Sequence, residues 1–287
     1  MGLILLFIVF LISIFARAPT GEAWGKQGHF MTCKIAEKYL TEKTSKAVLD
    51  LLPEIANGEL ASVCAWADEV RFRYRWSSHL HYINTPDCTY KFSRDCHDNK
   101  GVKDRCVVGA INNYTEQLRS YGDSSSGYNL TESLMFLVHF VGDVHQPLHV
   151  GLEADEGGNT IIIHWYRRKT NLHHVWDSNI IETALKDFYR NDQSSMIEAI
   201  SKNITDSDAD SWDNCRNKRV TCANNYALES IHLSCNYAYK DVEENATLGD
   251  DYFFSRLPVV EKRIAQGGVR LAAILNQIFD TSLVEII

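Results

Sequence analysis

Apolar residues recur at helical spacing along most of the chain. In the C-terminal segment 259–279, Val260, Ile264, Leu271 and Leu275 fall on one face, as in a helix that packs against a core. The sequence has only 5 prolines, which suits long helices. It therefore predicts a mainly α fold. Helices are expected at 32–40, 45–52, 130–144, 178–189, 193–204 and 259–279.

One segment follows the period of a strand instead. Residues 160–166 (TIIIHWY) come directly after Gly157, Gly158 and Asn159, and they combine β-branched with aromatic residues. We expect a short strand or β-hairpin there. Polar stretches at 85–104, 121–128, 153–159 and 206–219 are expected to be loops.

The N-terminus has the pattern of a signal peptide. Residues 3–15 form a short apolar run, and small residues end at Ala23 before Trp24. A helix that crosses a bilayer needs about 20 apolar residues, so the alternative of an N-terminal membrane anchor is disfavoured. We expect residues 1–23 to be removed. No linker divides the remaining residues, which predicts one domain over residues 24–287. We expect this domain to have no membrane anchor and to be a monomer.

The cysteines and sequons agree with a secreted protein. The chain has 8 cysteines, an even number behind a secretory signal, so four disulfides are expected, with a pairing that spacing alone does not reveal. Asn-X-Thr sequons predict N-glycosylation. The expected destination is extracellular or vacuolar. The cysteines are Cys33, Cys64, Cys88, Cys96, Cys106, Cys215, Cys222 and Cys235, and the sequon asparagines are Asn113, Asn129, Asn203 and Asn245.

Candidate chemistry lies in two histidine–aspartate pairs. His139 and Asp143 stand four residues apart in an apolar helical segment, and His173 and Asp177 repeat that spacing. A buried imidazole and carboxylate must be paired or bind a metal. For one pair alone, a structural hydrogen bond is the favoured explanation. Two pairs, with His149 just beyond the first, favour a metal site instead.

Several motifs together resemble the S1/P1 nuclease family, especially its plant bifunctional endonucleases. The likeness covers essentially the whole chain after residue 23, with the motifs in the family's order. These motifs are WGKQGH at 24–29, WADEVR at 66–71, HFVGDVHQPLH at 139–149, GGN at 157–159 and NLHHVWD at 171–177.

The resemblance implies a mainly helical phospholipase C/P1 nuclease-like fold and three Zn²⁺ ions per chain. Cleavage before Trp24 would create one ligand, because an α-amino group loses its proton more readily than lysine does. The other histidines match no ligand position; His174 is the nearest rival of His173. The implied ligands are Asp68, His81, His139 and Asp143 for one ion; the amino group and carbonyl of Trp24, with His29 and a shared Asp143, for a second; and His149, His173 and Asp177 for the third.

The implied activity is endonucleolytic hydrolysis of single-stranded DNA and RNA to give 5′-phosphate ends, with 3′-nucleotidase activity as a further option. Asp68 would orient the nucleophile and Arg71 would neutralise charge on the phosphoryl oxygens. Tyr82 and Asn84 would bind the base beside the scissile phosphate, and Asn159 would lie at the rim. Alternatively, Arg71 is a surface cation and Tyr82 a core aromatic.

The formal net charge of −8 is unusual for a protein that binds a polyanion. Divalent ions would outweigh the three ligating aspartates and make the site locally positive. Without a basic track, binding should depend on the metals and on stacked bases, which favours single strands.

Two other functions fit parts of the pattern. Zinc-dependent phospholipases C are similar to this family, so a lipid phosphodiester is the nearest alternative substrate. A zinc-storing defence protein without activity is more remote, because it would need coordinatively closed sites.

Overall fold

The computed structural model describes residues 24–212 and 221–280. The predicted signal peptide, Cys215 and the last seven residues lie outside these ranges. The helices are α1 (Lys26–Glu37), α2 (Glu42–Leu51), α3 (Trp66–Val70), α4 (Phe92–Asp95), α5 (Val107–Leu118), α6 (Leu130–His145), α7 (Leu172–His174), α8 (Ile180–Phe188), α9 (Gln193–Lys202), α10 (Asp206–Trp212), α11 (Ala223–Leu233) and α12 (Asp250–Phe279). Short helical turns are η1 (Glu54–Ala56), η2 (Leu60–Val63), η3 (Arg75–Leu80), η4 (Pro147–His149), η5 (Glu153–Asp155), η6 (Val175–Asn179) and η7 (Ser234–Ala238).

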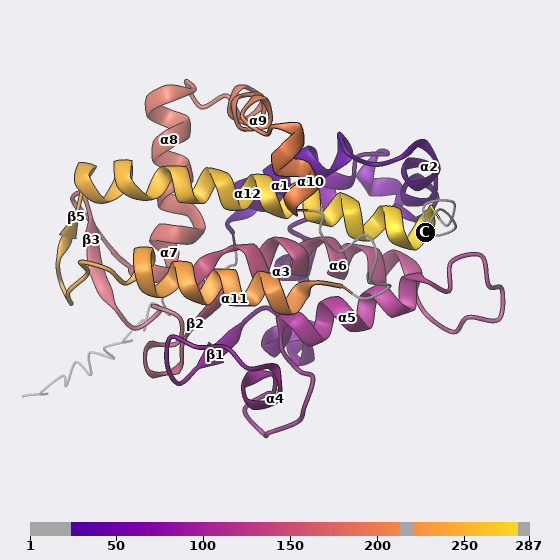
Figure 1. Cartoon of the computed structure of the whole chain (residues 1–287), viewed down its shortest axis with the longest axis horizontal. Coiled ribbons are helices and arrows are strands. Elements are labelled where there is room, and N and C mark those ends of the chain that lie inside the picture. Colours follow the sequence, from indigo (N-terminus) through magenta and orange to yellow (C-terminus); the bar gives the residue numbers. More distant parts are fainter. Residues whose placement is uncertain (1–23, 213–220, 281–287) are drawn as a thin grey trace, which may run out of the picture.

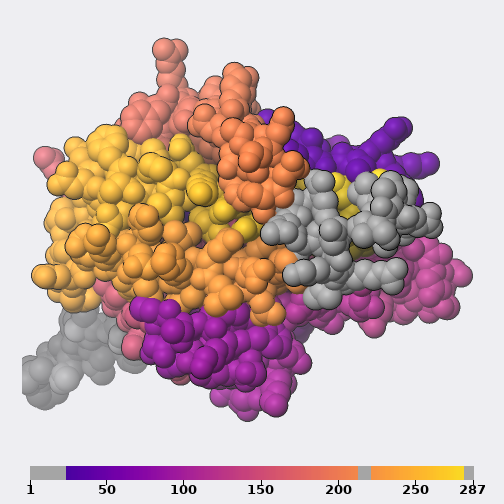
Figure 2. All heavy atoms as spheres, viewed as in Figure 1, coloured from indigo at the N-terminus to yellow at the C-terminus, as the bar shows by residue number. Residues whose placement is uncertain are grey.

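Helix α12 runs along the long axis of the molecule (Figure 1). Its side chains belong to two apolar clusters. Its C-terminal half, with Leu271 and Leu275, packs in the cluster that holds α5 and α6. Its N-terminal half, with Phe253 and Val260, packs in the cluster that holds α8 and α9. On the face in Figure 2, the orange and yellow residues of the C-terminal third form much of the surface.

Strands are few and short, as the sequence predicts. The strands are β1 (Ile83–Thr85), β2 (Val150–Leu152), β3 (Ile162–Trp165), β4 (Arg168–Asn171) and β5 (Thr247–Leu248). The predicted hairpin is confirmed, since β3 pairs antiparallel with β4, and β5 adds to β3 in parallel. Strand β1 pairs in parallel with β2, with Ile83 opposite Val150, and so brings the segment after His81 beside the segment after His149.

The mainly α prediction is confirmed, but some boundaries were wrong. Helix α12 begins at Asp250 and continues through Pro258, because the buried side chains of Phe253 and Leu257 pack this first part into the core. Helix α10 occupies part of a predicted loop. Its capping box was missed: Asp208 N donates to Thr205 Oγ1 at 3.1 Å while Thr205 N donates to the Asp208 carboxylate at 3.2 Å.

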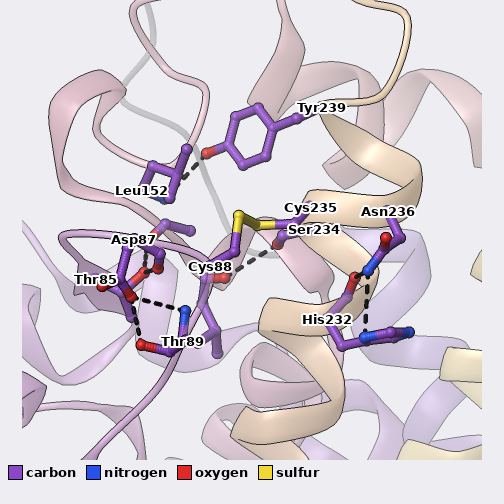
Figure 3. Close-up of a disulfide and its surroundings, with 12 residues drawn as sticks. Thr85, Asp87, Cys88, Thr89, Leu152, His232, Ser234, Cys235, Asn236 and Tyr239 are labelled. Atoms are coloured by element: carbon purple, nitrogen blue, oxygen red, sulfur yellow. Dashed lines mark hydrogen bonds between the residues drawn. A yellow bond between two sulfur atoms is a disulfide. The ribbon is translucent and has the colours of Figure 1, made fainter.

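All seven described cysteines are disulfide-bonded. The described pairs are Cys33–Cys64, Cys88–Cys235 and Cys96–Cys106. Cys88–Cys235 ties the segment after β1 to η7 across 147 residues of sequence (Figure 3). Beside it, the Tyr239 hydroxyl accepts from Leu152 N at 3.1 Å. The loops around β1 and β2 are thus fixed by a covalent and a polar link.

The asparagines of the four predicted glycosylation sites lie on the surface. Asn113, Asn129, Asn203 and Asn245 are all exposed, as glycosylated asparagines must be. None of the helices among the described residues combines the length and apolar character that a membrane span needs.

Candidate metal centre

Two groups of buried histidines and aspartates come together from separate elements. His29 comes from α1, Asp68 from α3, His81 from the end of η3, and His139 and Asp143 from α6. We call these five residues the Asp143 box. The His173 group consists of His149 from η4, His173 from α7 and Asp177 from η6. Within each of three sets of three, the possible ligand atoms lie within 4.8 Å of one another: His29, Asp68 and His139; His81, His139 and Asp143; and His149, His173 and Asp177.

The Asp143 carboxylate touches imidazoles on both of its oxygens. Oδ1 lies 3.2 Å from His29 Nε2. Oδ2 lies 3.0 Å from His81 Nδ1 and 3.3 Å from His139 Nε2. Asp68 faces His81 and His139 from the other side, at 3.5 and 3.6 Å. Asp143 is therefore placed to bridge two cations.

The His173 group follows from local helical geometry. Asn171 caps the start of α7 by accepting from His174 N at 2.7 Å, and the chain continues into the π-helical turn η6. His173 and Asp177 then share a face, with Nε2 and Oδ2 3.3 Å apart. His149 Nε2 completes the group 3.2 Å from His173 Nε2.

Backbone carbonyls set the tautomers of three histidines. The Nδ1 atoms of His139, His149 and His173 lie 2.6 to 2.7 Å from the carbonyl oxygens of Cys64, His81 and Gly157. A carbonyl only accepts, so each Nδ1 carries a proton, and in the neutral rings of His149 and His173 the lone pair of Nε2 faces inward. A hydrogen bond from the ring nitrogen that faces away from the metal is typical of metal-binding histidines.

The nitrogen and oxygen atoms that face into the two groups are better suited to bind cations than to hydrogen-bond to one another. His149 Nε2 and His173 Nε2 face each other at 3.2 Å with two lone pairs, an arrangement that needs a proton or a metal ion between them. His29 Nε2 and Asp143 Oδ1 are close, yet neither makes a hydrogen bond of acceptable geometry. Buried polar atoms without hydrogen bonds are costly, so the donor set fits Zn²⁺, which takes imidazole nitrogen and carboxylate oxygen.

Burial favours the ligand form of most of these histidines. Desolvation lowers the pKa of His29, His81 and His149 well below its ordinary value, and it lowers the pKa of His173 to about 4. Burial also acts to lower the pKa of His139. The neighbouring carboxylates of Asp143 and Asp68 together have the larger effect, and they raise the pKa of His139 to about 9. Four of the five imidazoles are therefore neutral near pH 7, as metal binding requires.

Trp24 lies at the edge of both groups. Its side chain is fully buried, and the amide of the following Gly25 donates to the carbonyl of Asp177 at 2.7 Å. Helix α1 then carries His29 into the Asp143 box. The main chain next to Trp24 thus lies between the turn that carries Asp177 and the helix that carries His29.

The predicted substrate-binding residues are only partly brought together. Arg71 Nη1 lies 3.5 Å from Asp68 Oδ1, next to the box. Tyr82 and Asn84 line a cavity of about 150 Å³. Asn159 does not line this cavity, and its side-chain amide donates to Glu156 O at 2.8 Å.

Sequence reasoning missed Gln146, whose side chain supports the His173 group. It is fully buried; its Nε2 donates to Asp177 Oδ1 at 2.5 Å and its Oε1 accepts from Leu148 N at 2.5 Å. The available signal was its position between Asp143 and His149, where a buried amide needs partners. Gln146 holds Asp177 in the orientation that faces His173.

His145 and His174 lie outside the two groups, as the sequence predicts. His145 is buried, however, and not on the surface: its Nδ1 donates to Val141 O at 2.7 Å and its Nε2 accepts from Arg270 at 3.1 Å. His174 is half-buried. Neither side chain is among the candidate ligand sets of the described residues.

Substitution of Gly142 tests how tightly the Asp143 box is built. A Cβ at this position would lie 2.6 Å from His29 Nδ1, and His29 itself stacks on His139 with ring centroids 3.9 Å apart. Alanine normally stabilises a helix interior over glycine by about 1 kcal/mol. Because the buried His29 has no room to move, we expect Gly142→Ala to lower metal content and to reduce activity about 10-fold or more.

Metal analysis and thermal unfolding of the variant would check this expectation. Gly127→Ala is the matched control, since a Cβ there meets nothing within 4 Å. Full metal content with a raised unfolding temperature in Gly142→Ala would show that His29 adjusts freely.

Comparison with known proteins places this arrangement among nucleases. The model of the family described as S1/P1 Nuclease matches residues 24–280. "Endonuclease 2" of Arabidopsis thaliana is 55% identical over 285 residues, which cover 97% of this chain and 98% of that protein. "Endonuclease 4" of the same plant is 57% identical over 268 residues, 90% of each chain. "Nuclease P1" of Penicillium citrinum is 31% identical over 280 residues, 91% of this chain and 100% of the fungal protein.

Proposed function

The chain belongs to the S1/P1 nuclease family and is a hydrolytic nuclease, and from this premise we propose that it is a zinc-dependent endonuclease for single-stranded DNA and RNA. Cleavage would leave 5′-phosphate ends, and 3′-nucleotidase activity is a further part of the proposal. The observation that carries the metal dependence is the meeting of imidazole nitrogens and carboxylate oxygens inside the two groups, where several of these buried atoms have no hydrogen-bond partner.

Three ions would divide the candidate ligands as follows. Asp68, His81, His139 and Asp143 would hold the first; the amino group and carbonyl of Trp24, with His29 and Asp143, the second; and His149, His173 and Asp177 the third. When bound, such ions lower the pKa of water and stabilise charge on the reacting phosphate.

The protein's own residues would position the reactants. Asp68, whose Oδ1 lies 3.5 Å from both His81 Nδ1 and Arg71 Nη1, would accept a hydrogen bond from the attacking water and orient it. Arg71 has a side chain 22% exposed, so its guanidinium reaches solvent and would pair with the phosphoryl oxygens. Tyr82 and Asn84 would receive the adjacent base in the cavity that they line.

A single strand suits this site better than a duplex. A base that enters the Tyr82 cavity must leave its stack, which costs least in a flexible single strand.

We further propose that residues 1–23 are a signal peptide, that residues 24–287 act as one domain and a monomer, and that the glycosylated protein is extracellular or vacuolar. The disulfides and the exposed sequons support this route.

The test is metal content by mass, combined with cleavage of single-stranded and duplex DNA and RNA, on protein that begins at Trp24. We expect about three zinc ions per chain, one for each of the three proposed groups of ligands. A chelator should abolish cleavage, and single strands should be cut faster than duplexes, with 5′-phosphates at the new ends.

Other results would redirect the assignment. Zinc-loaded protein that leaves nucleic acids intact but releases phosphorylcholine from lecithin would indicate a lipid phosphodiesterase. Metal-free protein with full activity would contradict the metal dependence.

A further inference from the structure

A turn of alternating arginines and aromatic residues lies beside the Asp143 box. Residues 71–76 read RFRYRW and connect α3, which carries Asp68, to η3, which leads into His81. In a chain with a formal net charge of −8, three arginines in six residues are a local exception. We call residues 72–76 the arginine–aromatic turn.

Hydrogen bonds hold the backbone of this turn. Arg73 N donates to Val70 O at 2.8 Å, and Ser77 Oγ donates to Tyr74 O at 2.8 Å. Arg105 Nη2 donates to Trp76 O at 2.5 Å. The side chains that point outward are thus presented from a fixed backbone, which lowers the entropy cost of binding.

Two arginines of the turn have no polar partner among the residues that the structure describes. Arg73 and Arg75 are exposed, and among the described residues neither forms an ion pair or a side-chain hydrogen bond. The acidic residues around the turn have other partners. Asp68 faces Arg71 at 3.5 Å, Glu69 pairs with Lys26 at 3.3 Å, and Glu132 accepts from Tyr74 at 3.0 Å.

The aromatic residues of the turn divide into an inner and an outer set. Tyr74 packs inward, with its ring centroid 6.3 Å from Phe136 and 6.0 Å from Trp66. Trp76 packs one side against Phe136 at 5.6 Å and remains 46% exposed, and Phe72 is 73% exposed. Exposed flat rings between unpaired cations are the combination that binds single-stranded nucleic acid, through stacking and phosphate contacts.

We propose that the arginine–aromatic turn binds the substrate strand outside the scissile phosphate, with Arg73 and Arg75 on backbone phosphates and Trp76 stacked on a base. The Cα atoms of Arg71 and Arg75 are at most about 14 Å apart, so a strand held at Arg71 reaches the turn within a few nucleotides. The turn would add a local basic contact to a site for which the sequence as a whole predicts no basic track. The inference rests on the proposed function and names how a longer substrate is held.

The test compares a long substrate with a short one. We expect Arg73→Ser/Arg75→Ser to raise KM for a single strand of about 16 nucleotides by about 5- to 30-fold, the effect of two exposed ion pairs. The slope of log(kcat/KM) against log[salt] should become shallower by about 1.4, since each phosphate contact on a single strand contributes about 0.7. Cleavage of a dinucleotide, which is too short to reach the turn, should be unchanged.

Arg167→Ser/Arg168→Ser is the matched control, because it removes the same charge from the exposed β3–β4 turn. Trp76→Leu, which keeps apolar packing on Phe136, should also raise KM for the long strand alone. Equal salt slopes in the two double variants would overturn the inference. A rise in KM for the dinucleotide as large as the rise for the long strand would overturn it too. If the wild-type protein cleaves neither substrate, the proposed function fails first and the inference falls with it.

Discussion

Asp143→Asn is expected to remove nearly all nuclease activity and about two of the three proposed metal ions. The Asp143 carboxylate faces His29 with one oxygen and His81 and His139 with the other. Asparagine has the same shape, but its NH₂ group presents a donor where one of these oxygens lay, and a donor cannot bind a cation. Loss of a group that merely hydrogen-bonds to a ligand costs about 10- to 100-fold, so loss of a shared ligand should cost more than about 100-fold.

Metal content by mass and kcat/KM on single-stranded DNA would check this result. Asp187→Asn, an exposed aspartate beside Lys186, is the control for the same chemical change outside the site. The His173 group should keep its ion, because its own ligands are intact. A variant with three ions and wild-type activity would show that Asp143 is not the shared ligand.

Retention of Ala23 ahead of Trp24 is expected to reduce activity by more than about 100-fold, with loss of one ion. The α-amino nitrogen is basic and titrates near pH 8, whereas the same nitrogen in a peptide bond has no lone pair to offer a metal. The hydrogen bond from Gly25 to Asp177 and the start of α1 fix this end of the chain beside His29 and Asp177. Because those side chains remain in place, the ions held without Trp24 should stay.

Chains that begin at Ala23 and at Trp24 would be compared by metal content, activity and thermal unfolding in chelator. Trp24→Phe, in a chain that begins at position 24, separates the side chain from the amine: it should lose stability, because the ring is fully buried, but keep its metal. Equal metal content in the chains with and without Ala23 would exclude the amino group as a ligand.

The sequence alone determined the elements whose pattern is local. Four-residue spacing predicts that His139 and Asp143 share one face of a helix, and likewise His173 and Asp177, because the helical period makes such side chains neighbours whatever surrounds them. The strand within 160–166 and the mainly α class follow from the same short-range periodicity. The family likeness supplied the remaining ligand positions, since their wide separation in sequence carries no local signal.

The tertiary structure alone decided how these pieces meet. His29, Asp68 and His81 reach Asp143 only because α1, α3 and η3 pack around α6, and the carbonyls of Cys64, His81 and Gly157 select the lone pairs that face inward. Packing also determined that α12 begins at Asp250, and it left Arg73 and Arg75 exposed, with no ion pair or side-chain hydrogen bond to the residues of 24–212 and 221–280. Local propensity is a weak guide to such features, because the burial of distant apolar surfaces sets helix boundaries and contacts between segments. The sequence pattern thus predicts the candidate ligands in pairs, and the packing of distant helices brings these pairs together in one site.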